Sequence, residues 1–317
     1  MIRRGLGLVV LAAAGAAAAA PFAYITNQGS HDVSVIDLAR HEVVATVPVG
    51  RSPAGVVASS RAGKVYVSNP DSRTISVIDM RSQKVVATLP AGSGPVGIDA
   101  SPDGQRVFVA DWYRNRLLVL DPGGPATAPV EIEVGRAPAG VAVSADGRTV
   151  YVAERDDDSV AAIDLERRAV TARAKVGTHP FALLLDAPRE RLYALNVLSD
   201  DVSVVDLRTM TVRATVKVGK APYGAALARG GALLYVTNQH GNTVSVIDAE
   251  TLAVQRTLPG FAYPEGIAAH GDRVYVVNWM DDNVAVLDAR TGRTLDTIAT
   301  GTNSRGFGAF IGAPAAP

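Results

Sequence analysis

A single phrase recurs seven times along this chain, at intervals of 40 to 43 residues. Each copy starts with an aromatic residue and three further residues, continues through a polar loop to a strand-like segment ending in aspartate, and then reaches another strand-like segment. The aromatic residues are Tyr24, Tyr66, Phe108, Tyr151, Tyr193, Tyr235 and Tyr275. The aspartates keep the same intervals, at Asp37, Asp79, Asp121, Asp164, Asp206, Asp248 and Asp288. Two independent markers therefore count seven units.

The content of one unit predicts the architecture. Residues 54–90 contain four short segments of alternating or β-branched character, AGVVASS, KVYVSN, TISVIDM and KVVATLP. Turn sequences such as SPDG (101–104) separate segments of this kind. After residue 20, no apolar stretch keeps a 3.6-residue period long enough for a helix. The sequence thus predicts an all-β, seven-bladed β-propeller with four-stranded antiparallel blades.

The two ends of the chain predict how the ring closes. Residues 21–23 alone precede Tyr24, so the first unit lacks its opening strand. Residues 302–311 follow the last unit and have no second strand behind them. Because an open ring would expose sheet edges, we expect the C-terminal strand to join residues 24–49 and complete the closing blade.

Residues 1–20 have the features of a secretion signal peptide. Arg3 and Arg4 precede an apolar run that ends in small residues. Residues 21–317 are then predicted to form a single propeller domain with no membrane span in the mature chain. The chain has no cysteine, which excludes a lipobox, a disulfide framework and thiolate metal sites. We expect a periplasmic or secreted protein that is a monomer.

Charge gives no reason to expect a polyanion as partner. The chain has 31 Lys and Arg against 31 Asp and Glu. Acidic loops at residues 156–158, 200–201 and 281–282 would repel one. A protein or an envelope component fits this balance best.

The repeated phrase resembles that of the YVTN-repeat β-propeller family, in particular its YncE-like secreted members. Residues 24–27 (YITN) and 235–238 (YVTN) match the namesake, whereas residues 108–111 (FVAD) and 151–154 (YVAE) depart from it. The resemblance covers essentially the whole mature chain and implies the propeller fold. For function it implies several classes: surface-layer or adhesin-like proteins, proteins near quinoprotein and metal-handling systems, and single-stranded DNA binding in a YncE-like relative.

The seven aspartates have a structural interpretation. Each ends a strand just before a turn, where a carboxylate can accept backbone N–H bonds. They lie one per blade and therefore far apart, so we expect them to cap turns.

A Gly-x-x-Pro element, such as residues 50–53, follows the last strand-like segment of a unit and leads into the next blade. The residue after its proline is expected to ring the mouth of the central channel. These residues are Ala54, Val96, Ala139, Phe181, Tyr223, Glu265 and, where Ser304 replaces proline, Arg305. The four large ones belong to consecutive units, so the mouth would have one bulky side and one open side. Phe181 and Tyr223 offer flat faces to a ligand, and Glu265 and Arg305 offer directed hydrogen bonds. The alternative is that Glu265 and Arg305 pair with each other across neighbouring blades.

Both tryptophans occupy the same position in the repeat, directly after the four-residue phrase. Trp112 and Trp279 lie in units three and seven, where they could stack on bases, sugars or a planar ligand, or else pack between blades. The other binding residues predicted in loops of this face are Tyr113, Arg114, His179 and His240.

Motifs for catalysis and for metal binding are missing from the sequence. There is no Gly-x-Ser-x-Gly, no His-Glu-x-x-His and no EF-hand spacing, and no pair of histidines has metal-ligand spacing. We therefore predict no catalytic residues, no metal site and no cofactor.

The sequence as a whole predicts a non-catalytic binding module whose loop face, around the central channel, engages a protein, an envelope component or a small ligand. Single-stranded nucleic-acid binding and a propeller enzyme, such as a lactonase, a lyase or a quinone-linked dehydrogenase, remain as alternatives.

Ring closure through the C-terminus is directly testable. Deleting residues 301–317 should remove most of the cooperative stability, because two blade edges lose their partner. Thermal unfolding followed by circular dichroism measures this loss. A truncated chain with an unchanged melting curve would contradict the predicted closure.

Overall fold

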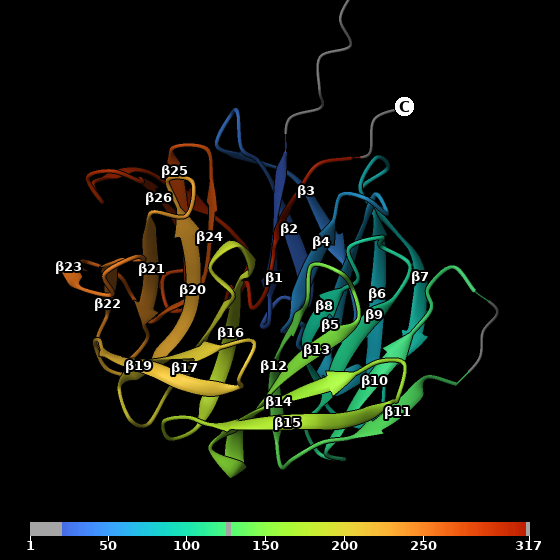
Figure 1. Ribbon diagram of the computed structural model, residues 1–317. Helices are drawn as coiled ribbons and strands as arrows, with labels where there is room; N and C mark the ends of the chain where they lie inside the picture. Colours follow the sequence, from blue (N-terminus) through green and yellow to red (C-terminus); the bar gives the residue numbers. More distant parts are fainter. Residues whose placement is uncertain (1–20, 125–127, 315–317) are drawn as a thin grey trace, which may run out of the picture.

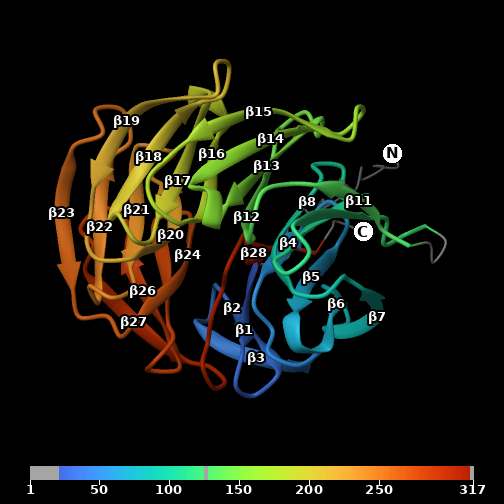
Figure 2. The ribbon, with the colours of Figure 1, turned by 90° about the horizontal axis from the view of Figure 1, so that it is seen from below.

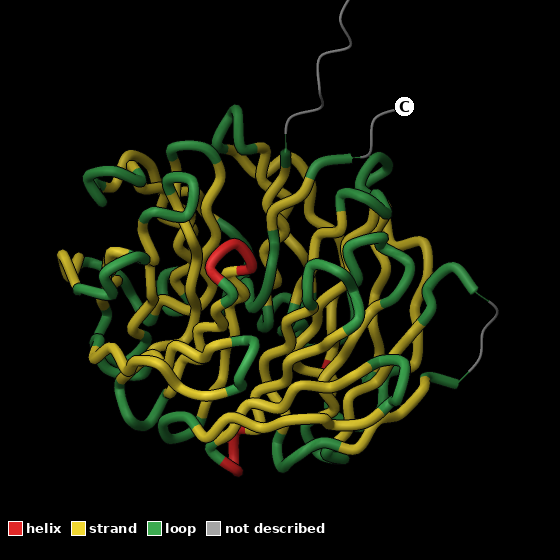
Figure 3. Tube along the Cα trace, in the orientation of Figure 1, coloured by secondary structure: helices red, strands yellow, loops and turns green. Residues whose placement is uncertain are grey.

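The computed structural model describes residues 21–124 and 128–314, so the predicted signal peptide lies outside the described residues. Seven four-stranded antiparallel sheets follow one another around a ring in chain order (Figure 1). The predicted seven-bladed propeller is confirmed. The helices of the described residues are three 3-10 turns of three residues each (Figure 3). None of the helices in this part of the chain could cross a membrane.

Each blade runs from an inner strand at the channel to an outermost strand at the rim, and we number the blades in chain order. Blade 1, the closing blade, comprises β28 (Ile311–Gly312), β1 (Phe22–Asn27), β2 (Asp32–Asp37) and β3 (Glu42–Pro48). Blade 2 comprises β4 (Val56–Ser59), β5 (Lys64–Asn69), β6 (Thr74–Asp79) and β7 (Lys84–Pro90). Blade 3 comprises β8 (Pro95–Ala100), β9 (Val107–Asp111), β10 (Arg116–Leu120) and β11 (Val130–Glu133).

The remaining four blades follow the same order from the channel outward. Blade 4 comprises β12 (Pro138–Val143), β13 (Thr149–Glu154), β14 (Ser159–Asp164) and β15 (Ala169–Lys175). Blade 5 comprises β16 (Pro180–Asp186), β17 (Arg191–Asn196), β18 (Asp201–Asp206) and β19 (Thr211–Lys217). Blade 6 comprises β20 (Pro222–Ala228), β21 (Leu233–Asn238), β22 (Thr243–Asp248) and β23 (Val254–Pro259). Blade 7 comprises β24 (Pro264–His270), β25 (Arg273–Asn278), β26 (Asn283–Asp288) and β27 (Thr294–Ala299).

Burial explains why the two middle strands of a blade are rich in valine and isoleucine. In blade 5, the last five residues of β17 and all six of β18 are buried, because neighbouring blades cover both faces. The outermost strand β19 instead alternates between exposed and less exposed positions. A continuous apolar run therefore marks a middle strand of a blade, and alternation marks its outermost strand.

Side chains of the four-residue phrase make hydrogen bonds between neighbouring blades. The hydroxyl of Tyr235 donates a hydrogen bond to the carbonyl of Ala289 in blade 7 at 2.9 Å. Two residues further along the same strand, the hydroxyl of Thr237 donates to the carbonyl of Glu265 at 2.8 Å. Ser68 makes the equivalent bond from blade 2 to Val96 of blade 3, at 2.7 Å. Where the third residue of the phrase carries a hydroxyl, it therefore links its blade to the next one, whereas the units with Ala, Leu or Val at that position lack this bond.

All seven repeated aspartates cap turns, as predicted. Asp248, for example, accepts hydrogen bonds from the backbone N–H groups of Glu250 at 3.0 Å and Thr251 at 2.8 Å. These bonds hold the pKa of its carboxyl below the ordinary value. The other six accept the corresponding N–H bonds from the residues two and three positions later.

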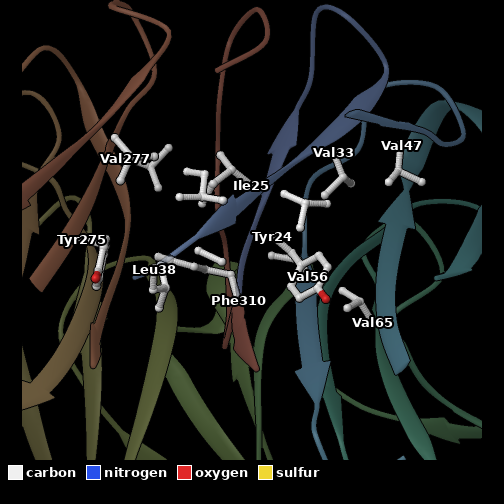
Figure 4. Packing of buried hydrophobic residues seen from close by; sticks show 14 of the residues in the cluster. Tyr24, Ile25, Val33, Leu38, Val47, Val56, Val65, Tyr275, Val277 and Phe310 are labelled. Atoms are coloured by element: carbon white, nitrogen blue, oxygen red, sulfur yellow. The ribbon is translucent and has the colours of Figure 1, made fainter. Parts of the chain in front are cut away.

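The C-terminal segment closes the ring, as predicted. β28 pairs antiparallel with β1, with Ala23 opposite Ile311, and an isolated bridge joins Asn27 to Ser304. In Figure 2 this red segment runs beside the blue N-terminal strand. Phe310 belongs to the buried core cluster that also contains Tyr24 (Figure 4).

The closing blade differs from the others by two extra residues in its inner strand. In blade 7, five steps from Pro264 to Ala269 match four steps of β25, whereas in the closing blade seven steps from Ser304 to Ile311 match four steps of β1. We call residues 305–309 the C-terminal bulge. Within it, Gly306 and Gly308 adopt φ values of 138° and 124°, which favour glycine.

The C-terminal bulge also attaches the closing blade to blade 2. The backbone N–H of Val56 donates to the carbonyl of Phe307 at 2.9 Å, and that of Ala58 donates to the carbonyl of Ala309 at 2.8 Å. The ends of the ring are thus joined on both sides of the C-terminal segment.

Phe310 is expected to be one of the most sensitive core positions. Phe310→Ala should lower the free energy of unfolding by about 3–5 kcal/mol, because it empties a fully buried position at the ring junction. Urea denaturation measures this loss. Leu198→Ala is the control, since the Leu198 side chain is 59% exposed and its loss should change stability by less than about 0.5 kcal/mol. Equal effects of the two substitutions would contradict a stabilising junction.

Candidate ligand-binding face

The turns around the channel mouth are held by a repeated contact that we call the inter-blade latch. The backbone N–H of His179, just before Pro180, donates to Asp158 of the preceding blade at 2.9 Å. The N–H of Ala221 donates to Asp200 at 2.8 Å. The same latch joins Asn115 to Ala137, Asn242 to Tyr263, Asp282 to Asn303 and His31 to Ser52. Residues on both sides of each latch have positive φ, between 47° and 60°.

The latch explains much of the acidic character of this face. Asp158, Asp200 and Asp282 each accept a hydrogen bond from a backbone N–H at the start of the next blade. Asp157 pairs with Arg136 at 2.7 Å. The sequence alone suggested that these aspartates are loop charges, because each partner lies 21 residues away along the chain, either later (for Asp158, Asp200 and Asp282) or earlier (for Asp157).

Four of the residues predicted to ring the mouth form one continuous contact chain. The rings of Phe181 and Tyr223 stack with centroids 4.5 Å apart. The guanidinium of Arg305 donates to the hydroxyl of Tyr223 at 2.6 Å and to the carboxylate of Glu265 at 2.6 Å. The structure therefore contains the pairing of Glu265 with Arg305 that the sequence left as one of two alternatives.

The charges in this chain are compensated and largely buried. Glu265 is 2% exposed and also accepts a hydrogen bond from the side-chain amide of Gln239 at 2.8 Å. Burial raises the pKa of Tyr223 well above its ordinary value, so its hydroxyl stays protonated. Burial acts to lower the pKa of Arg305, but the neighbouring Tyr223 and Glu265 outweigh it and raise that pKa.

Phe307 of the C-terminal bulge fills the side of the mouth that the sequence predicted to be open. Its ring centroid lies 4.8 Å from that of Phe181, in a cluster that includes Ala139 and Val96. Phe181, Tyr223 and Phe307 are each at most 9% exposed. Phe307 was not among the predicted residues, although the two extra residues of this segment and the glycines on both sides of Phe307 in RGFGAF (305–310) are a signal in the sequence. The channel mouth is closed.

Trp112 packs against this closed mouth. Its ring centroid lies 6.2 Å from that of Phe181. The guanidinium of Arg155, in the neighbouring blade 4, lies 5.3 Å from the centroid of the Trp112 ring. Tyr113 is 75% exposed. Arg114 lies 3.8 Å from Glu131 as a surface ion pair.

Trp279 belongs to a separate aromatic cluster. Its centroid lies 5.5 Å from that of Tyr263, which in turn lies 5.4 Å from His240. The His240 Nε2 and the Tyr263 hydroxyl are 3.0 Å apart. Tyr263 was missed by the sequence analysis. The Nδ1 of His179 is buried without a hydrogen-bond partner among the described residues. Trp112, Phe181 and Tyr223 thus form one aromatic group, and Trp279 and His240 form another together with Tyr263.

Candidate metal ligands are scattered. Across residues 21–124 and 128–314, no three His, Asp or Glu side chains come together as ligands of one ion. Asp157, Asp158, Asp200 and Asp282 hold backbone or arginine groups, as described above. The face offers aromatic surfaces and compensated ion pairs for recognition.

Two family models match parts of the chain. One, described as a YNCE-like beta-propeller, matches residues 59–146, and the other, described as a lactonase with a 7-bladed beta-propeller, matches residues 124–217. These matches and the seven blades confirm the resemblance that the repeated phrase indicated. The comparison with curated proteins found no match.

Solved structures share the fold. A hydrazine synthase chain from Kuenenia stuttgartiensis superposes with a TM-score of 0.73 at 19% identity, covering 90% of this chain and 99% of its own. The dihydro-heme d1 dehydrogenase NirN gives 0.69 at 17% identity, covering 90% and 74%. A functionally unknown protein from Desulfotomaculum acetoxidans gives 0.76 at 15% identity, covering 93% and 99%. At these identities the likeness shows the fold alone.

The buried ion pair gives a test of the closed mouth. Arg305→Met should lower the free energy of unfolding by about 3–5 kcal/mol, because it leaves the Glu265 carboxylate buried without its cation. The double variant Glu265→Gln/Arg305→Met should recover most of this loss. Urea denaturation of the wild type, both single variants and the double variant gives the coupling energy. Additive effects would contradict the pairing.

Proposed function

We propose that this YncE-like, seven-bladed propeller is a non-catalytic binding module that engages a protein partner on its channel-mouth face. The distribution of exposed apolar side chains carries this proposal. The three most exposed large apolar side chains of the described residues are Tyr113 at 75%, Met280 at 61% and Leu198 at 59%. All three lie in loops of the mouth face, whereas the other exposed ones lie on outermost strands.

The closed mouth favours a macromolecular partner over an inserted small ligand at this face. The rings of Phe181, Tyr223 and Phe307 contact one another across the mouth and are at most 9% exposed, so a partner would lie across them. Exposed aromatic and methionine side chains next to partly buried tryptophans match the composition of protein interfaces. Trp112 and Trp279 are partly buried and directly precede Tyr113 and Met280, so they would help to hold these exposed side chains in place.

The ionic groups at the mouth support binding without covalent chemistry. The Glu265 carboxylate is paired with Arg305 and hydrogen-bonded to Gln239, and the Tyr223 hydroxyl stays protonated. A general acid or base needs access to the reacting atom and a pKa near the working pH. The names of two structural neighbours include a synthase and a dehydrogenase, so a propeller enzyme remains the alternative of a different class.

Single-stranded nucleic acid is the second candidate partner. Arg155 over the Trp112 ring and the exposed Tyr113 nearby resemble a stacking platform for bases. The charge balance favours protein, because Arg155 is paired with Asp156 and Arg136 with Asp157. These two pairings reduce the positive charge available to neutralise phosphates.

The location proposed for this binding is the periplasm or the extracellular space. The support is the sequence of residues 1–20, whose basic start and apolar run are typical of a secretion signal.

Exposed apolar residues of the mouth face should control partner binding. The triple variant Tyr113→Ala/Leu198→Ala/Met280→Ala should weaken capture of a partner from an envelope extract by at least about tenfold, since apolar anchors dominate such interfaces. The control is Val86→Ala/Val254→Ala, which removes exposed apolar side chains from the outermost strands β7 and β23. Quantitative mass spectrometry of the captured proteins measures both. Equal capture by the triple variant and the wild type would sink the proposal.

Oligonucleotide titration separates the two partner classes. Fluorescence anisotropy with single-stranded DNA at low salt should show no saturable binding. Binding that falls steeply with added salt and is lost in Trp112→Ala would replace the protein partner with nucleic acid.

A further inference from the structure

A second candidate site lies inside the ring, beneath the closed mouth. The central cavity has a volume of about 390 Å³, within the usual range for small-ligand sites. Its walls come from the inner strands β8, β12, β16, β20 and β24 and from the C-terminal bulge. Phe307 and Glu265 line its end nearest the mouth, and none of the exposed residues of the proposed partner surface, Tyr113, Leu198 and Met280, lines it.

The walls of the cavity are largely apolar. Glycines such as Gly97 and Gly140 line it, and Leu184, Leu185 and Leu227 line it further from the mouth. These three leucines are partly exposed. Because the mouth is sealed, a ligand would enter from the opposite end of the channel, past the leucines.

The described lining residues include two ionisable side chains, Glu265 and Asp99. Glu265 is neutralised by Arg305. Asp99 instead accepts backbone hydrogen bonds from Ala100 at 2.8 Å and from Val143 of the next blade at 2.9 Å. Among the described residues no cation pairs with it, and burial raises the pKa of Asp99 to about 6.

Asp99 is therefore a carboxylate with no counter-ion among the described residues, at the wall of a largely apolar chamber. Two backbone donors leave further lone pairs on its oxygens free to accept hydrogen bonds. The inner strand of each blade is also an edge strand, so one row of backbone groups faces the channel. The cavity thus combines one negative charge, backbone acceptors and apolar walls.

We propose that the central cavity binds a small amphiphilic cation, an apolar molecule with one protonated amine, whose ammonium donates to Asp99. An ammonium has three donors, which suit the carboxylate and neighbouring backbone carbonyls. The apolar body fits against the leucines. Anions are repelled, and a neutral molecule leaves the Asp99 charge uncompensated.

Three probes of equal length test this site: n-hexylamine, n-hexanol and hexanoate. Isothermal titration calorimetry at pH 7.5 should give an affinity for the amine at least about tenfold above that for the alcohol, as expected for a hydrogen bond to a charged group. Hexanoate should not bind. This comparison uses the unaltered protein and does not depend on the folding of any variant.

Variants then assign the effect to Asp99. Asp99→Asn should abolish the preference for the amine and keep the binding of hexanol, which also reports that the variant is folded. Ala225→Leu should weaken both probes by occupying the cavity that Ala225 lines. Glu133→Gln removes the same charge from a side chain that is 82% exposed on β11, and should leave both affinities unchanged.

Three results would overturn the proposal: no binding of the amine, equal affinity for the amine and the alcohol, or an unchanged amine affinity in Asp99→Asn. None of these results bears on partner binding at the mouth face, because Tyr113, Leu198 and Met280 do not line the cavity. Loss of partner capture with retained hexylamine binding, and the reverse, therefore distinguish the two proposals.

Discussion

The joining of the last residues to the first strand is the constraint on which this structure depends. Each blade buries both faces of its middle strands against two neighbours, so an open ring would leave two such faces in water. β28 and Phe310 close that gap from one side, and the hydrogen bonds of Phe307 and Ala309 to β4 close it from the other. The stability of all seven blades is therefore linked to a short segment at one end of the chain.

The same segment also builds the channel mouth. Arg305 reaches Glu265, 40 residues earlier, and Tyr223, 82 residues earlier, because ring closure brings the closing blade beside blade 7. Phe307 then fills the space that small residues leave on the far side. The C-terminal bulge thus contributes to both proposed sites. It lies between the mouth surface suited to a partner and the cavity suited to a small cation.

Many acidic groups of the described residues have structural partners, which narrows the search for functional carboxylates. The repeated aspartates cap turns, Asp158, Asp200 and Asp282 hold the mouth turns of the next blade, and Glu265 is paired. These assignments leave the uncompensated carboxylate of Asp99 as the exception inside the ring. In a repeat fold, departures from the shared pattern are the informative positions, because the shared pattern already serves packing.

The sequence by itself determined the number of blades, their four strands, the turn caps and the way the ring closes, because these follow from local patterns repeated at a constant interval. The unpaired segment at residues 302–311 predicted the closure, and the repeated aspartates predicted the capped turns. Tertiary structure alone decided that Glu265 pairs with Arg305, that Phe307 seals the mouth and that Asp99 faces a cavity without a cation. The reason is physical: these contacts join different blades, and the geometry of the closed ring, rather than any local periodicity, sets which side chains meet.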